Sequence, residues 1–498
     1  MSVVAVQRLG IPQKSSYDRV RLSCVSHVVY LVLDFATMPS LASSSVLLSA
    51  LTAGAVAKYT FDPLQHLAGV APYFEPETPS FDPAPPQGCN VTRAAYLVRH
   101  AAIYANDFDY ESYIEPFVEK VIASQLSNSS VDWSKSRSLS FLSTWQSPIS
   151  ESESEKLTRV GQLEAFKLGI DVSDRYPSFA QPGKVWTSTA ERTVKSANSF
   201  ISGLVTQANE TTLVQVSEGE EEGADSLTPY EGCPAYSSSR GSKQSQTYQK
   251  IFTAPILSRF RAQVPNFNWT ANDISGMFEL CGYETVIRGS SPFCSLDVFS
   301  PDDWQGFEYT NDIMYFQNTG YGNPISGTIG FPWVNATAGL LLASDNDNST
   351  GKQQDLYVSF THRELPPTVL VALGLFNNSA FSGANDVNAT MPNDEINPYR
   401  AWQSSKILPF LTNIAVEKLE CDSYGYQDNA TTTGEYYRVL VNQSPQLLPG
   451  CVDGPGFSCS RSGFEKFVQE RGEMFGDFSN KCGVDYDNST DVIGIYSK

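Results

Sequence analysis

The chain has 498 residues, of which 41% are hydrophobic and 18% are charged. This composition can bury a substantial core, and it excludes an intrinsically disordered chain. The formal net charge of −20 disfavours a nucleic-acid partner, because proteins that bind phosphate backbones present basic surfaces. The length suits one large two-part unit or two domains once a leader is removed.

The first 57 residues have the pattern of a secretory leader. Residues 41–57 read LASSSVLLSALTAGAVA and end in the small-x-small cleavage triplet Ala55-Val56-Ala57. Met38 comes shortly before this run, so we interpret 1–57 as a leader region and Met38 as the candidate true start. The alternative is a signal-anchor at 24–35, but that run is short and contains Asp34. No later apolar run is long enough to span a membrane, so we expect no stable membrane insertion.

Residues 58–88 are rich in proline and aromatic residues, and we expect them to form an extended arm. Apolar runs and helical periodicity then predict, in order, a strand at 94–98, helices at 112–126 and 156–170, a strand at 184–188 and a helix at 190–204. The acidic segment 217–226, SEGEEEGADS, is typical of a solvated surface turn rather than a binding tract.

The second half alternates helical and strand signals. Residues 227–340 mix aromatic helical pieces with turns, which favours a helical lobe. Further elements are a strand at 355–360, a helix through 368–376, and late strands at 413–420 and 435–442. The repeated order of strand, turn and helix predicts an α/β fold.

The cysteines and glycosylation sequons indicate an oxidising compartment. Cys24 stands apart near the start, and the other eight of the nine cysteines suit four disulfides. Eleven N-x-S/T sequons favour a secreted, extracellular glycoprotein. The cysteines form no CxxC pair and no cluster with histidine, so no metal is expected.

Two of the four histidines occupy equivalent places in the pattern. His100 and His362 each come just after a predicted strand. A lone histidine is more often structural than catalytic, but the carboxyl ends of parallel strands are where open α/β sheets form ligand sites. The pair therefore marks a candidate site.

Motifs along the chain resemble those of the histidine acid phosphatases, the branch that includes fungal phytases and inositol-polyphosphate phosphatases. The resemblance runs in the family's order from about residue 60 to 498. It is carried by YLVRHAAIY (96–104), LTRVGQ (157–162), TSTAERTVKSA (187–197), SLTPYEGCPAY (226–236), the segment 277–304, GYGNP (320–324), LYVSFTHRELPPTVLVALGLF (356–376), WQSSKILPF (402–410) and YRVLVN (437–442).

The resemblance implies a three-layer α/β/α domain with a mainly parallel sheet, of the phosphoglycerate mutase type, plus a smaller helical domain. The α/β core would comprise about 89–111, 180–226 and 340–498, and the helical lobe about 112–179 and 227–339. It also implies four disulfides, Cys89–Cys421, Cys233–Cys482, Cys281–Cys294 and Cys451–Cys459.

The same resemblance implies the site residues and their roles. His100 would be the nucleophile that forms a phosphohistidine. Arg99 and Arg192 would hold the phosphate oxygens, and His362 would stabilise charge in the transition state. No metal or organic cofactor is needed, because arginines and imidazoles supply the positive charge.

Two departures from the family motifs affect this assignment. Arg363 and Glu364 follow His362 where many relatives have His-Asp, so Glu364 is the expected proton donor; alternatively it only caps the next helix. Ile103 replaces a phosphate-binding arginine, a loss that plausibly costs about 1.5–3 kcal/mol. We hypothesise that Arg363 substitutes for that cation.

The expected function is a secreted phosphomonoesterase, an acid phosphatase with phytase-like features. Asp107, Asp109 and Glu111 crowd the loop after the first predicted strand. If they face the mouth of the site, they favour small, weakly charged phosphate monoesters over phytate; the alternative is an ordinary solvated loop. The alternatives are a phosphate-binding pseudo-enzyme and a phosphatase specialised for one phosphorylated metabolite. The leader and sequons make a phosphomutase less favoured.

Overall fold

The computed structural model describes residues 21–25, 28–32, 61–75, 81–204, 210–344, 353–379, 390–422, 434–485 and 489–497. The chain divides into two units, Met1–Thr60 and Phe61–Lys498. In the first unit, β1 (Arg21–Val25) and β2 (Val28–Val32) form an antiparallel pair. Met38 and the apolar run 41–57 of the expected leader lie outside the described residues. No helix within the described ranges is long and apolar enough to cross a membrane.

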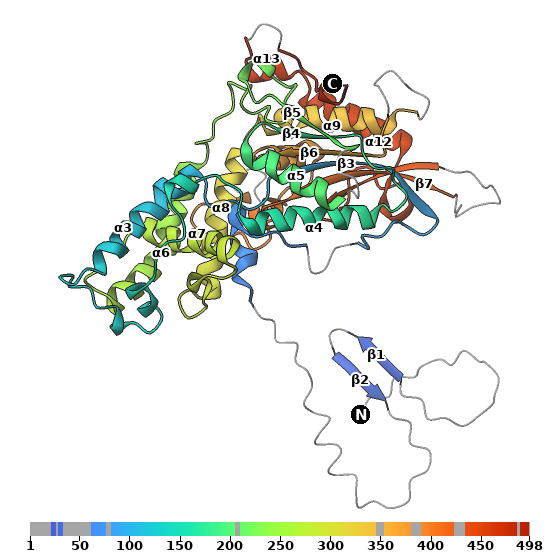
Figure 1. The fold of residues 1–498 in the computed structure, drawn as a ribbon. Coiled ribbons are helices and arrows are strands. Elements are labelled where there is room, and N and C mark those ends of the chain that lie inside the picture. The colour runs from blue at the N-terminus through green and yellow to red at the C-terminus, as the bar shows by residue number, and fades with distance from the viewer. Residues whose placement is uncertain are drawn as a thin grey trace, which may run out of the picture. The chain divides into compact units, whose positions relative to one another are not determined.

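An eight-stranded mixed sheet forms the centre of the second unit (Figure 1). Its strand order is β10-β8-β7-β3-β6-β4-β5, with β9 paired to β8. The neighbours β3, β6, β4 and β5 are parallel, whereas β7 runs antiparallel to β3, and β8 antiparallel to β7. The strands are β3 (Cys89–Arg99), β4 (Lys184–Ser188), β5 (Thr212–Val216), β6 (Leu356–Thr361), β7 (Asn413–Cys421), β8 (Gly434–Val441), β9 (Ser444–Gln446) and β10 (Cys459–Ser460).

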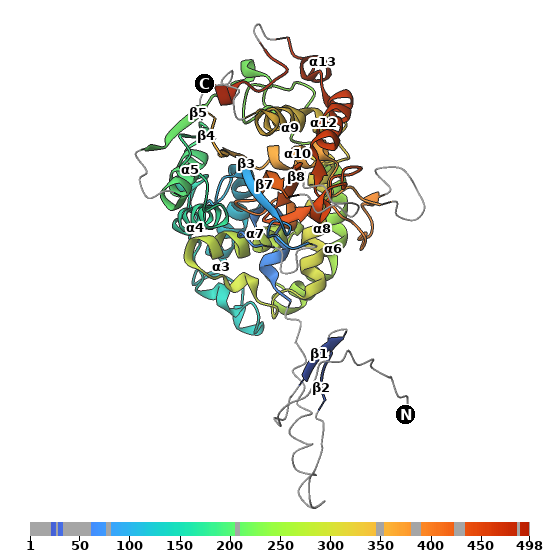
Figure 2. The same cartoon turned by 90° about the vertical axis from the view of Figure 1, so that its right-hand side faces the viewer.

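Helices cover both faces of this sheet (Figures 1 and 2). One face carries α4 (Arg159–Arg175) and α5 (Glu191–Leu204), and the other carries α9 (Ser326–Leu342), α10 (Leu365–Leu373) and α12 (Arg461–Phe475). Because helices bury both faces, β3 and β6 are near-continuous apolar runs without alternation. The predicted three-layer α/β/α class and the strands around both histidines are confirmed.

The helical lobe packs around aromatic side chains. It contains α3 (Glu115–Ser124), α6 (Ser242–Gln263), α7 (Ala271–Arg288) and α8 (Pro301–Asn318). The ring of Phe278 lies 4.1 Å from that of Phe299 and 4.6 Å from that of Trp304, measured between centroids. The predicted helix at 112–126 begins with a π-helical turn, Tyr110–Ile114, and continues as α3. α4 falls within the predicted helical-lobe range 112–179, but it packs on α5 beside the sheet.

Short elements complete the unit. The proline-rich arm contains two 3-10 turns, Pro63–His66 and Ala68–Val70, so it is not uniformly extended. The other short elements are α2 (Asp107–Asp109), α11 (Ser404–Ile407), α13 (Phe478–Cys482) and 3-10 turns at Trp133–Lys135, Ser140–Ser143, Glu151–Glu153, Glu220–Glu222, Pro292–Cys294, Pro455–Phe457 and Ile495–Ser497.

Four disulfides cross-link the second unit. Cys89 and Cys421 face each other across β3 and β7, and their bond joins the strand that precedes His100 to a late strand. The other bonds are Cys233–Cys482, Cys281–Cys294 and Cys451–Cys459. All four pairings implied by the family resemblance are confirmed.

One sequon lies where a glycan has no room. Asn442 is 3% exposed, and its Oδ1 accepts hydrogen bonds from the Thr412 hydroxyl and the Asn413 amide, each at 2.9 Å. Its Nδ2 donates to the Lys406 carbonyl. By contrast, the described sequon asparagines Asn90, Asn128, Asn268, Asn335 and Asn377 are exposed.

We therefore expect Asn442 to carry no glycan when the protein is expressed through a glycosylating secretory pathway, because the attached sugar would displace this buried amide network. Enzymatic deglycosylation in heavy-oxygen water, followed by peptide mass spectrometry, converts occupied asparagines to labelled aspartate. Label at Asn90 or Asn335 but not at Asn442 is the expected pattern. Full labelling of Asn442 in folded, active protein would contradict it.

Candidate active site

The sheet brings the two histidines together. In the parallel pair β3 and β6, Arg99 lies opposite Thr361, so the next residues, His100 and His362, emerge side by side. Their ring centroids are 5.9 Å apart, at an interplanar angle of 64°. Both side chains are buried, and the His100 amide donates to the Thr361 carbonyl at 2.8 Å. The two histidines of the candidate site therefore lie at the same edge of the sheet.

The surroundings of His100 leave one ring nitrogen free to attack. Its Nδ1 lies 2.9 Å from the carbonyl oxygen of Ala101, which can only accept. Nδ1 therefore carries the proton and Nε2 the lone pair. Burial, followed by the charges of Arg99 and Arg192, lowers the pKa of His100 well below its usual 6.5. The imidazole accordingly stays neutral and nucleophilic in mildly acidic solution.

The loop after His100 is anchored to the start of α4. Thr158, the N-cap of α4, donates from both its amide and its hydroxyl to the Ala102 carbonyl. Gly161 is required in the same turn, because a Cβ there would collide with the Ala102 backbone. Ile103 is buried in the core and pairs with Leu157, so it does not face the pocket as the lost family arginine would.

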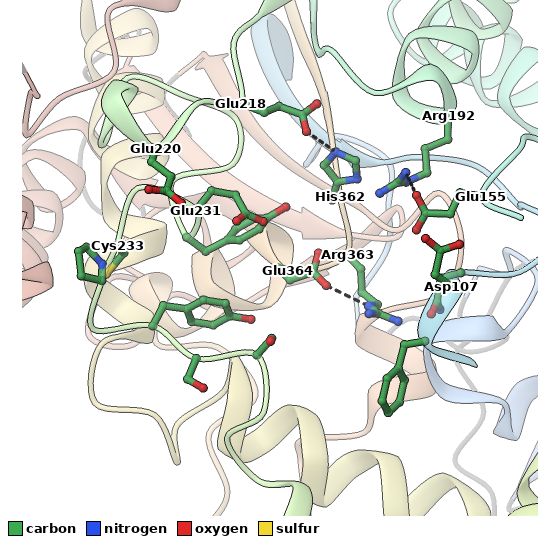
Figure 3. Close-up of a pocket in the computed structure, with 17 residues that line it drawn as sticks. Asp107, Glu155, Arg192, Glu218, Glu220, Glu231, Cys233, His362, Arg363 and Glu364 are labelled. Atoms are coloured by element: carbon green, nitrogen blue, oxygen red, sulfur yellow. Dashed lines mark hydrogen bonds and ion pairs between the residues drawn. The ribbon is translucent and has the colours of Figure 1, made fainter. Parts of the chain in front are cut away.

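A pocket of about 830 Å³ opens over this edge of the sheet (Figure 3). His362, Arg192, Arg363 and Glu364 line it together, and His100 adjoins it beside His362. Arg192 comes from the first turn of α5, and its Nη1 lies 2.5 Å from Glu155 Oε2. The wall carries six carboxylates, those of Asp107, Glu155, Glu218, Glu220, Glu231 and Glu364.

Arg99 lies deeper than the other cations. Its Nη1 donates to the Gly69 carbonyl at 2.6 Å and to the Leu408 carbonyl, and its guanidinium lies 4.5 Å from the centre of the Phe410 ring. Burial, followed by the charge of Arg363, lowers the pKa of Arg99 to about 10. Its buried Nε has no hydrogen-bond partner in the described part of the chain. Arg99 thus ties the arm to the site while keeping one unused donor.

Glu364 is placed to interact with Arg363 rather than to cap a helix. Its side chain makes no cap hydrogen bond to α10, and its Oε1 accepts from Arg363 Nε at 3.1 Å. Burial opposes ionisation of this carboxyl, but Arg363 and His362 outweigh it and lower the pKa below its usual 4.5. Arg363 also lies over the Tyr315 ring, at 5.6 Å from its centre.

The acidic loop 217–226 is not the solvated turn that its composition suggested. Glu218 Oε2 lies 3.3 Å from His362 Nε2, while its Oε1 accepts from the Ala190 amide at 2.8 Å (Figure 3). Burial opposes ionisation of the Glu218 carboxyl, but the hydrogen bond to His362 and the charge of His362 outweigh it and lower the pKa of Glu218 to about 2. Only the position of this loop in the sequence could have pointed to a role in the site, because the loop follows β5, which ends at the sheet edge where the histidines lie.

The three acidic residues of the segment after His100 lie in different environments. Asp107 lines the pocket, as expected. Asp109 is buried and accepts from the Tyr283 hydroxyl at 2.7 Å and from Asn106 Nδ2. Glu111 is exposed on the π-helical turn and lies outside the pocket wall.

We expect Glu218→Gln to lower kcat about tenfold to a hundredfold with little change in KM, because the carboxylate fixes the orientation of the His362 imidazole. Steady-state kinetics with p-nitrophenyl phosphate provide the measurement. Glu221→Gln is the matched control, since Glu221 is an exposed acid of the same loop outside the pocket wall; it should stay within about twofold of wild type. Equal kcat values for the two variants would refute the role of Glu218.

The fold matches solved phosphatase structures. The phytase from D. castellii superposes with a TM-score of 0.75 at 23% identity, over 87% of this chain and 90% of that chain. The multiple inositol polyphosphate phosphatase of Bifidobacterium longum, in complex with inositol hexasulfate, gives a TM-score of 0.54 at 11% identity, over 81% and 97%. At these identities the likeness extends to the fold alone.

Sequence relatives cover most of the chain. Acid phosphatase PHO1 of Komagataella pastoris is 29% identical over 84% of this chain and 86% of its own length. Phytase PHO112 of Candida albicans is 28% identical over 90% and 92%. The model of the histidine phosphatase superfamily, branch 2, matches residues 92–442, which contain both strand-end histidines. The chain therefore belongs to the histidine phosphatase superfamily, branch 2.

Proposed function

We propose that the protein is a secreted acid phosphatase that hydrolyses phosphate monoesters through a phosphohistidine on His100. The observation that carries this proposal is the state of His100, a buried, neutral imidazole with a free Nε2 beside His362. Such a nitrogen attacks phosphorus without first losing a proton.

The surrounding side chains supply the rest of the reaction. Arg192 and Arg363 hold the phosphoryl oxygens, aided by the unused Nε–H of Arg99, and His362 stabilises the charge that develops on them. As the His100 Nε2–P bond forms, the ester P–O bond breaks and Glu364 protonates the leaving oxygen. Water then attacks the phosphohistidine, giving its proton to the Glu364 carboxylate, and releases phosphate and free His100.

The charge of the pocket supports small, weakly charged substrates. Six carboxylates share the wall with two arginines, and those arginines already pair with Glu155 and Glu364. A substrate with several phosphates would meet more negative than positive charge. We therefore propose that the protein hydrolyses simple monoesters faster than phytate. The four disulfides and the exposed sequons support work outside the cell.

The test is phosphate release between pH 3 and pH 7. We expect wild type to hydrolyse p-nitrophenyl phosphate and glycerol phosphate fastest at acidic pH, with phytate slower. In acid, Glu364 gains the proton it must donate, while the low pKa of His100 keeps the nucleophile neutral. An absence of turnover with every ester, together with retained phosphate binding, would favour the alternative of a phosphate-binding pseudo-enzyme. Ile103, which stands where the family motif has an arginine, is the observation that supports this alternative.

A further inference from the structure

Helix α4 presents an apolar stripe to the outside of the molecule. It lies beside α5 on one face of the sheet (Figure 1). Leu163 is 67% exposed, Phe166 38% and Ile170 39%. Their spacing of three and four residues places the three side chains on one face of the helix, on successive turns. Single exposed apolar residues are common on protein surfaces, but a contiguous exposed stripe is typical of a surface that contacts a partner.

The packing of α4 against α5 fixes which face of α4 points outward. The two helices approach closely at Gly169 and Gly203, because a Cβ at Gly169 would collide with the Phe200 carbonyl and one at Gly203 with the Phe166 carbonyl. The buried side of α4 is formed by Gly161, Ala165, Leu168, Gly169 and Val172. Rotation of α4 about its axis would break this close fit, so the apolar stripe stays exposed.

The two ends of the stripe carry opposite charges without partners. Arg159 in the first turn of α4 and Asp174 in the last turn are both exposed. Neither side chain makes a hydrogen bond or an ion pair with another described residue of the chain. Each charge also stands at the end of the helix where the helix dipole disfavours it. The two charges therefore do not stabilise α4 itself, which points to a partner outside the chain.

The outward face of α4 is complementary to itself. A two-fold axis that passes midway between Phe166 and Lys167 relates each residue of this face to one that suits it. The pairs across that axis are Arg159 with Asp174, Leu163 with Ile170, and Phe166 with Lys167. Two antiparallel copies would therefore gain ion pairs at both ends, aliphatic contacts between them, and lysines beside aromatic rings at the centre. No glycosylation sequon lies within α4.

We propose that two copies of this chain form a symmetric dimer in which α4 packs antiparallel to α4 of the second copy. This inference goes beyond the phosphatase function and does not depend on it. A contact centred on one helix from each copy is small beside the about 800 Å² per partner of a standard interface. The expected dissociation constant is therefore in the micromolar range.

Charge reversal tests the ion pairs at the ends of the stripe. In sedimentation velocity between about 1 and 100 µM, the whole wild-type protein should shift from monomer to dimer as its concentration rises. Arg159→Glu and Asp174→Lys should each raise the dissociation constant at least about tenfold, because each places like charges opposite one another twice. Both changes suit the helix dipole, so α4 should stay folded. The double variant, and an equimolar mixture of the two single variants, should recover the dimer because the ion pairs form again with reversed sign.

A second pair of variants tests the apolar centre. Phe166→Glu should leave the protein monomeric over the same concentrations. Ile122→Glu is the matched control, because Ile122 is 56% exposed on α3 in the helical lobe, and it should dimerise like wild type. Melting temperatures close to that of wild type show that each variant is folded.

Three results would overturn the dimer through α4. They are a wild type that stays monomeric throughout, equal dimerisation by Phe166→Glu and wild type, and single reversals that weaken the dimer without recovery in the double variant. A monomeric wild type that binds phosphatidylcholine vesicles, when Phe166→Glu does not, would assign the stripe to a membrane surface instead.

Discussion

Replacement of His100 by alanine is expected to lower kcat for p-nitrophenyl phosphate by about 10⁴-fold or more, as loss of a covalent nucleophile usually does. In the proposed reaction, the other contacts to phosphate come from Arg192, Arg363, His362 and the Nε–H of Arg99, so the variant should still bind inorganic phosphate. His100 packs against His362 and Phe410 without an ion pair, so its truncation should leave the fold in place.

Trapping of the intermediate makes this test specific. Rapid quenching of wild type with labelled phosphate ester should give an acid-labile, base-stable phosphoenzyme, with the label on the peptide that contains His100. The alanine variant should give none, at an unchanged melting temperature. Label on another residue, or turnover within about tenfold of wild type, would remove His100 from the role of nucleophile.

Replacement of Glu364 by glutamine is expected to act according to the leaving group. An alkyl ester such as glycerol phosphate needs a proton on its departing oxygen, so kcat should fall about 10²–10⁴-fold. p-Nitrophenolate departs without that help, so the rate of the initial p-nitrophenolate burst, which reports formation of the phosphohistidine, should fall less than about tenfold. The ratio of the two losses is the measurement, since a structural defect would reduce both rates alike.

The pH dependence gives a second readout of Glu364. Arg363 and His362 outweigh burial and hold its pKa below 4.5, and only the protonated carboxyl donates. Wild-type activity on glycerol phosphate should therefore decline as the pH rises through the lowered pKa of Glu364. The Glu364→Gln variant should lose this decline in its pH–rate profile. Glu231 is the natural comparison, because burial and the charge of Glu364 raise the pKa of this pocket carboxyl. A leaving-group-dependent loss in Glu231→Gln, with none in Glu364→Gln, would move the donor to Glu231.

Local sequence determined the two strands that precede the histidines, whereas the four cysteine pairs were implied by the family resemblance. β3 and β6 are buried on both faces, so their apolar runs were visible, and His100 and His362 follow them directly. The disulfide pairs came from resemblance, since eight cysteines allow 105 pairings and spacing selects none of them. The π-helical turn at Tyr110–Ile114 carried no signal, because its periodicity resembles that of an α-helix.

Only the tertiary structure decided which polar residues reach the site. The acidic composition of 217–226 predicted a solvated surface turn. In the structure, β5 ends at the same sheet edge as β6, and Glu218, which follows β5, therefore contacts His362. Asn442 matched a sequon, but the packing of β7 against β8 buries its side chain. Asp107 and Glu111 stand four residues apart, and only Asp107 lines the pocket. The sequence determined residue types and strand ends, whereas long-range packing determined burial, partners and therefore charge.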